Sequence, residues 1–108
     1  MNFGEAIEYC KQGAKIRNEN WNGKGMYVYY TPGRYIFLED WTGEVTEQER
    51  QKGAVRVLGH FDMINAQGER VIGWLASQMD MLSDAWEIVP DEPKDIEGIK
   101  RLFDEMEQ

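Results

Sequence analysis

Residues 20–30 of this 108-residue chain read NWNGKGMYVYY. Polar residues and glycines surround Trp21, and from Met26 onward the stretch favours a strand, because Tyr and Val prefer a pleated surface. Thr31-Pro32-Gly33-Arg34 is typical of a turn, so we predict a strand over 26–30 and a returning strand over 35–38. The stretch leaves one question open, namely whether Trp21 seals a hairpin or forms the rim of a small-molecule pocket.

The chain before this stretch predicts a helix. Apolar residues recur there at spacings of four, three and four: Phe3, Ile7, Cys10 and Ala14. This is one face of a helix over about residues 3–12, and Asn2 with Glu5 predicts a capping box at its start. Residues 15–17 alternate in polarity and predict a short strand.

The chain after this stretch predicts an excursion and a hairpin. Residues 40–53 are mostly polar and indicate a loop with at most one helical turn. Alternation predicts a strand over 55–63, residues 65–68 (NAQG) predict its turn, and a partner strand follows over 70–75.

A second short helix and a last strand follow. Ser77 with Asp80 predicts another capping box, which begins a helix of about residues 78–84. The buried side of this helix is expected to carry Met79 and Leu82. Residues 86–89 alternate as a strand, which places Trp86 in the core.

The C-terminal segment has its own pattern. Apolar residues recur there at spacings of three, four and three: Ile96, Ile99, Phe103 and Met106. This predicts an acidic amphipathic helix. We therefore predict an α+β domain over residues 1–90, with a small antiparallel β-sheet, an N-terminal helix and a short helix after the fifth strand, and an added C-terminal helix in an acidic extension over residues 91–108.

Charge and composition narrow the function classes. The net charge of −8 argues against binding of a nucleic-acid polymer, which needs a basic face. Residues 9–38, however, carry five basic residues and one acidic residue, a balance that suits a compact anion such as a phosphate and equally suits an ordinary solvent face. No apolar run is long enough to cross a membrane, and the opening residues lack signal-peptide features. We expect a cytoplasmic location and no membrane partner.

Groups that could carry catalysis are few. His60 is the single histidine and lies in a predicted strand, and Cys10 lies on an apolar helical face. The spacings of a transition-metal site, an EF-hand and a P-loop are all missing. We predict no catalytic residue, no metal site and no cofactor.

Residues that could form a binding site are more numerous than those that could carry catalysis. Trp faces can stack on a purine, amides beside Gly23 and Gly25 can approach an anion because no Cβ obstructs them, and Lys24 can supply a positive charge. Polar residues also gather at the start of the second helix: Ser77, Gln78 and Asp80. Taken one at a time, each of these residues also has a structural explanation as core, seal or cap.

Three blocks in order resemble a known family. They are MNFGEAIEYCKQGAKIR (1–17), WNGKGM (21–26) and WLASQMDMLSDAWEIV (74–89). Together, across residues 1–89, they resemble the Thoeris anti-defense 2 family of small phage proteins. The chain departs from the family pattern in a longer 40–53 excursion, in the added 91–108 segment and at Ala85, where an acidic residue is common.

The resemblance implies a function. Members of this family act as sponges: they bind and sequester cyclic ADP-ribose signals of bacterial Thoeris immunity without cleaving them, and some hold cyclic oligonucleotide signals. It also implies a homo-oligomer, a tetramer with pockets between subunits, in the cytoplasm of the infected bacterial host. The ligand-binding residues implied here are Trp21, Asn22, Gly23, Lys24, Trp74, Ser77, Gln78 and Asp80.

Two alternatives stay open. One is a small phosphodiesterase acting on the same nucleotides, for which His60 is the available group. The other is a phage structural or interaction protein whose acidic residues 91–108 dock on a basic partner.

Overall fold

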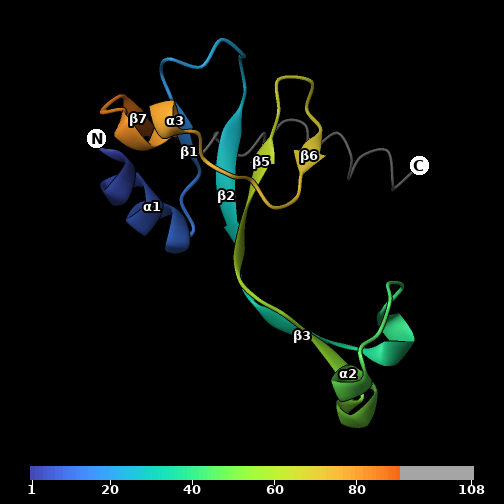
Figure 1. Ribbon diagram of the computed structural model, residues 1–108. Helices are drawn as coiled ribbons and strands as arrows, with labels where there is room; N and C mark the ends of the chain where they lie inside the picture. The colour runs from blue at the N-terminus through green and yellow to red at the C-terminus, as the bar shows by residue number, and fades with distance from the viewer. Residues whose placement is uncertain (91–108) are drawn as a thin grey trace, which may run out of the picture.

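The structure is a computed structural model that describes residues 1–90. The predicted C-terminal helix lies outside the described residues. The fold is α+β, as predicted, with an N-terminal helix, a mainly antiparallel sheet and short helices (Figure 1). Within the described part of the chain, no helix is long and apolar enough to cross a membrane.

Helix α1 (Phe3–Lys11) begins at the predicted capping box. The Asn2 side chain accepts a hydrogen bond from the Glu5 amide at 2.8 Å, and the Glu5 carboxylate accepts one from the Asn2 amide at 3.1 Å. These two bonds satisfy amides that the first helical turn leaves without partners. The apolar face of α1 then buries Ala6 and Cys10 completely.

The main sheet has five strands in the order β6-β5-β2-β1-β7, all antiparallel to their neighbours. The strands are β1 (Ile16–Asn18), β2 (Tyr27–Thr31), β5 (His60–Ile64), β6 (Arg70–Val71) and β7 (Trp86–Ile88). Ile16 in β1 lies opposite both Val28 and Ile88. Helix α1 covers one face of this sheet, and the core lies between them: Ala6, Cys10, Ile16, Val28, Met63 and Trp86.

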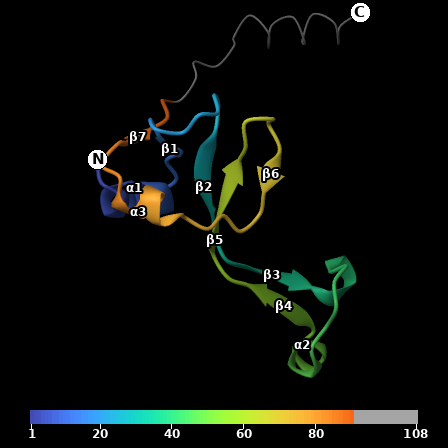
Figure 2. The same cartoon turned by 45° about the horizontal axis from the view of Figure 1, so that its top comes forward.

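The predicted return of residues 35–38 onto residues 26–30 is wrong. Strand β3 (Arg34–Phe37) pairs instead with β4 (Ala54–Val57) in a separate two-stranded sheet. Figure 2 shows this pair running away from the main sheet as an arm, which we define as residues 34–57. At its tip lie the 3-10 helix η1 (Leu38–Asp40) and helix α2 (Glu47–Lys52).

The arm continues one long hairpin, which explains the error. Thr31 lies opposite His60, and three residues later Arg34 lies opposite Val57, so Pro32-Gly33 interrupts the ladder without reversing the chain. A Cβ at Gly33 would lie 3.1 Å from the Gly59 nitrogen, so the two interrupted segments approach too closely for side chains there. The predicted strand over 55–63 is therefore two strands, β4 and β5.

The predicted strand over 70–75 is also shorter, because β6 ends at Val71. Gly73 has a φ of 82°, which does not continue a strand. Its amide donates to the buried Asp62 carboxylate at 2.8 Å, and the Trp74 amide donates to the Phe61 carbonyl at 2.7 Å. These bonds turn the chain toward the helix that follows.

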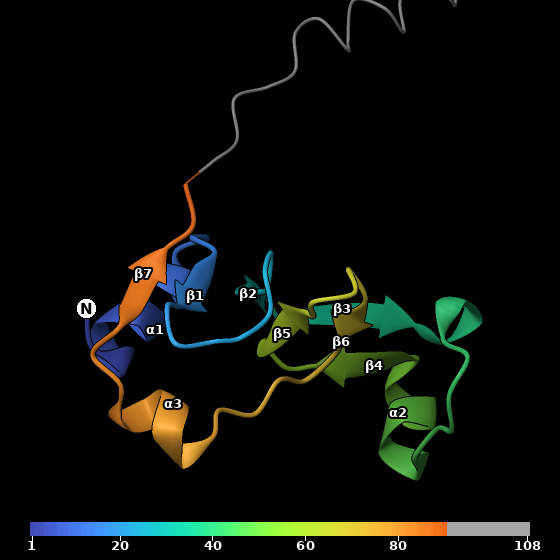
Figure 3. The same cartoon turned by 90° about the horizontal axis from the view of Figure 1, so that it is seen from above.

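Helix α3 (Gln78–Leu82) begins at the predicted Ser77 capping box, but its buried side is not the predicted one. Met79 is 85% exposed and Leu82 is 82% exposed. The helix is held by polar contacts of Asp80, described below, so its apolar side chains face outward. Seen from above, α2 and α3 lie on the same side of the strands (Figure 3).

Candidate functional site

Trp21, in the loop between β1 and β2, belongs to an aromatic cluster. Its ring lies edge-on to Trp86 at 5.3 Å and to Trp74 at 6.3 Å between centroids. It is half-buried and packs against the core. Trp21 is therefore part of the apolar packing: from a polar loop it reaches partners 53 and 65 positions further along the chain, which no local pattern reveals.

Asp80 ties this cluster to α3. One carboxylate oxygen accepts from the Trp21 indole nitrogen at 2.9 Å, and the other accepts from the Ser77 amide at 3.1 Å. The Asp80 carbonyl oxygen accepts from the Trp86 indole nitrogen at 2.8 Å. Asp80 thus holds two indoles and a helix start, and its charge repels an anion placed beside it.

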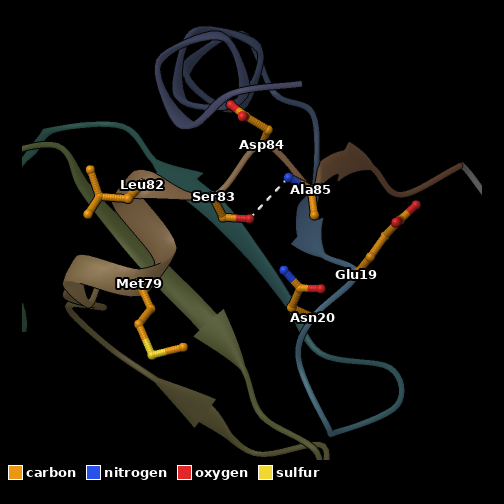
Figure 4. Close-up of a pocket in the computed structure, with 7 residues that line it drawn as sticks. All are labelled: Glu19, Asn20, Met79, Leu82, Ser83, Asp84 and Ala85. Carbon is orange, nitrogen blue, oxygen red and sulfur yellow. Dashed lines mark hydrogen bonds between the residues drawn. The ribbon is translucent and has the colours of Figure 1, made fainter.

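One hollow opens beside Trp21 toward α3. This Ser77 hollow has a volume of about 310 Å³ and is lined by Asn18, Asn20, Trp21, Ser77, Met79, Asp80 and Ser83. Its neighbour, the Ser83 hollow, has about 670 Å³ and shares Asn20, Met79 and Ser83 with it; the full lining is Glu19, Asn20, Met79, Leu82, Ser83, Asp84 and Ala85 (Figure 4). Side-chain amides and hydroxyls dominate the shared wall, and such groups bind sugar hydroxyls well.

A third hollow also has Trp21 in its lining. This Lys24 hollow has about 360 Å³ and is lined by Arg17, Asn18, Glu19, Trp21, Gly23, Lys24, Gly25, Met26 and Glu87. The Arg17 guanidinium donates to Glu87 at 2.6 Å and holds the pKa of that carboxyl below its ordinary value. Because this pair neutralises itself, Lys24 is the cation in this hollow that an anionic ligand can use.

The two glycines beside Lys24 are required for different structural reasons. A Cβ at Gly23 would collide with the Met26 sulfur and lie 2.8 Å from the Ala66 Cβ. Its missing side chain therefore serves internal packing, which corrects the expectation that it serves the approach of an anion. Gly25 has a φ of 77° and open space around its Cβ position, so it is required by the backbone conformation and leaves its surroundings accessible.

The structure brings together most of the residues that the sequence indicated. Trp21, Trp74, Ser77 and Asp80 form one connected group, and Gly23 and Lys24 line the hollow next to it. Asn22 and Gln78 are exposed and line none of these three hollows. Among the lining residues that sequence reasoning missed are Asn18, Asn20 and Ser83. The polar composition around Trp21 was the available signal for the two asparagines.

The reactive side chains lie elsewhere. Cys10 is fully buried, and burial raises the pKa of its thiol to about 11. His60 on β5 contacts the Asp62 carboxylate through Nδ1 at 2.8 Å, and that carboxylate also accepts from Thr31 at 2.5 Å and from Gly73. Burial by itself raises the pKa of Asp62, but these hydrogen bonds together lower it. Within residues 1–90, no group of three His, Cys, Asp or Glu side chains is placed to hold a metal ion.

Fold and site define a class: a small α+β domain with open hollows of ligand size, lined by polar and apolar side chains, around an aromatic cluster. The model of the Thoeris anti-defense 2-like domain matches residues 1–89, and the chain belongs to that family. A relative described as Thoeris anti-defense 2, from Bacillus phage SP01, is 30% identical over 89 residues. These cover 82% of this chain and 94% of the relative. The resemblance seen in the sequence is thereby confirmed.

Proposed function

We propose that the protein is a non-enzymatic phage anti-defense sponge, which binds a cyclic ADP-ribose-type signal and keeps it from its receptor. Family membership over residues 1–89 supports the anti-defense role. The observation that carries the finer proposal is that the surface next to Trp21 offers hollows lined by both polar and apolar side chains beside one usable cation, Lys24. Cyclic oligonucleotides share this chemistry and are the second ligand class.

Different residues of the hollows suit different parts of the ligand. Lys24 and the accessible backbone near Gly25 suit a pyrophosphate. Asn20, Ser77 and Ser83 suit ribose hydroxyls through hydrogen bonds. The exposed part of the Trp21 ring suits the apolar face of a purine.

The placement of the reactive side chains is consistent with sequestration without catalysis. Cys10 is buried with a raised pKa, and His60 is bonded to Asp62 on a strand of the main sheet. A sponge needs only affinity and a slow off-rate. A nanomolar dissociation constant corresponds to about −12 kcal/mol.

The hollows beside Trp21 are open in a single copy, and our proposal includes a homo-oligomer, a tetramer, in which a second subunit covers them. The hollows on the two sides of Trp21 have about 310 and 360 Å³, at the small end of the range for ligand pockets, about 300–1,000 Å³. A second subunit would close them. We place the protein in the host cytoplasm, where the signal is made.

Ligand recovery tests the proposal. The protein is incubated with cyclic ADP-ribose isomers and cyclic dinucleotides, washed, and heated, and the released compound is chromatographed. We expect intact ligand. A linear product would assign the protein to the phosphodiesterase class instead.

A matched pair of variants tests the site. Lys24→Gln should raise the dissociation constant roughly 10-fold, the effect of one charge-assisted bond, whereas Lys11→Gln on α1, where Lys11 pairs with Glu8 away from the hollows, should leave binding of the nucleotide within about 3-fold. A chain ending at residue 90 should still bind. Loss of binding on that truncation would favour the acidic-tail alternative.

A further inference from the structure

Large apolar side chains are exposed at several places in the described chain, and two of these surfaces lie on the arm and on α3. On the arm, Tyr35 is 69% exposed and Phe37 is 67% exposed. They line the arm hollow, of about 670 Å³, with Thr46, Gln48, Glu49, Lys52, Ala54 and Arg56. The other surface is the α3 ridge, defined as Leu75, Met79 and Leu82, which are 82–89% exposed.

The arm needs a covering partner. An isolated two-stranded ribbon is marginally stable in water, and a third strand or a packed face is needed for stability. Within residues 1–90, β3 and β4 pair only with each other, and Val55 is the single buried hydrophobic residue of the arm. The apolar face that would stabilise the ribbon therefore faces solvent in the single chain.

The charges around the two surfaces are complementary. The arm hollow carries Lys52 and Arg56, and the Arg56 guanidinium lies 4.8 Å from the centre of the Tyr35 ring. Glu49 is also there, but its carboxylate accepts from the Thr46 amide at 2.9 Å in the cap of α2. The α3 ridge borders Glu19 and Asp84, which line the Ser83 hollow with Met79 and Leu82. A cationic apolar hollow and an anionic apolar ridge fit one another.

We propose that the arm hollow of one copy receives the α3 ridge of a second copy, and that the second copy returns the same contact. This rests on the proposed homo-oligomer and names its surfaces. Because α2 and α3 lie on the same side of the strands (Figure 3), two copies facing each other about a two-fold axis make the contact twice. The commonest closed oligomers use this symmetry.

The pairing also completes the candidate site. Met79 and Leu82 belong both to the ridge and to the wall of the Ser83 hollow (Figure 4). The arm of the second copy therefore becomes an additional wall there and brings Lys52 and Arg56 to a hollow whose own charged groups are Glu19 and Asp84. These two cations offset the two carboxylates, so the paired site repels an anionic ligand less than the single chain does.

Mixing two defective variants gives a sharp test. Phe37→Glu damages the arm hollow and Met79→Glu damages the ridge; each alone breaks both contacts of a reciprocal pair. In an equimolar mixture, the intact arm of the Met79→Glu chain meets the intact ridge of the Phe37→Glu chain. We expect light scattering after size exclusion to show a lowered mass for each variant, with the dissociation constant of the oligomer raised roughly 30-fold or more, and a higher mass for the mixture.

Charge reversal gives a second, independent test, because Lys52 and Asp84 are exposed and tolerate substitution. Lys52→Glu and Asp84→Lys should each lower the mass, and the chain with both changes should recover it. Tyr9→Glu, at an exposed position of α1, is the control and should keep the parent mass. Melting curves confirm that each variant is folded.

Unchanged masses in all four interface variants would overturn the proposal. Lowered masses without recovery in the mixture would also overturn it, since the arm and ridge would then meet something other than each other. The masses are measured without nucleotide, so loss of the sponge function alone leaves this result unaffected.

Discussion

Replacing Trp21 by Ala separates a structural role from a ligand-binding role. Truncation of a fully buried Trp costs about 3–5 kcal/mol. Trp21 is half-buried, so we expect about half of that, roughly 2 kcal/mol, and a further ~1 kcal/mol for the hydrogen bond to Asp80. The free energy of unfolding should fall by about 3 kcal/mol, which lowers the melting temperature by roughly 12–24 °C in a domain of this size.

Two other tryptophans serve as references. Trp86 is 2% exposed and should cost the full ~3–5 kcal/mol when truncated. Trp41 on the arm is also half-buried, but it bonds locally, from its indole nitrogen to the Glu44 carbonyl at 2.9 Å, and does not pack against the core cluster, so its truncation should cost less than that of Trp21. Thermal melts and urea titrations measure all three.

The result that would refute this reasoning is a Trp21→Ala protein as stable as Trp41→Ala. The aromatic cluster would then contribute little, and Trp21 would be free to act as a ligand wall alone. If the stability does fall as expected, a loss of nucleotide affinity in Trp21→Ala is ambiguous. The Lys24→Gln variant is then the cleaner probe of the binding site, since Lys24 is exposed.

Three further predictions concern buried positions. The lowered pKa of Asp62 means that its ionised carboxylate stabilises the fold fully above its ordinary pKa of 3.8, and that this stabilisation is lost as pH falls through the lower folded value. Urea titrations from pH 7 to about pH 3 should show this loss of stability at acid pH, and Asp62→Asn should flatten it. Cys10 should react with an alkylating reagent only on unfolding, and rapid labelling of the native protein would show that it opens. Gly23→Ala should destabilise the chain by about 1–3 kcal/mol and should cost less in a Met26→Ala background than in the parent chain; an equal cost in both backgrounds, measured by denaturant titration, would mean that the collision with Met26 is not the cause.

Local signals in the sequence located most of the elements correctly. The capping boxes at Asn2 and Ser77 begin α1 and α3, because a cap is a contact between residues three positions apart. The apolar face of α1 and the buried Trp86 also follow from short-range periodicity, since burial on one side of an element imposes its repeat on the sequence. The family was recognisable from three ordered blocks for the same reason: each block is a short segment.

Pairing between distant residues was decided by the tertiary structure alone. Pro32-Gly33 has the composition of a turn, yet the ladder of β2 with β5 carries the chain straight on into the arm. Pairing between strands that are about 30 residues apart in the sequence outweighs a local turn preference here. In the same way, Met79 and Leu82 have helical spacing for a buried face, but the bonds of Asp80 to the distant indole of Trp21 and to the indole of Trp86 turn that face outward. Periodicity shows that a face is apolar, and only the folded arrangement shows what covers it.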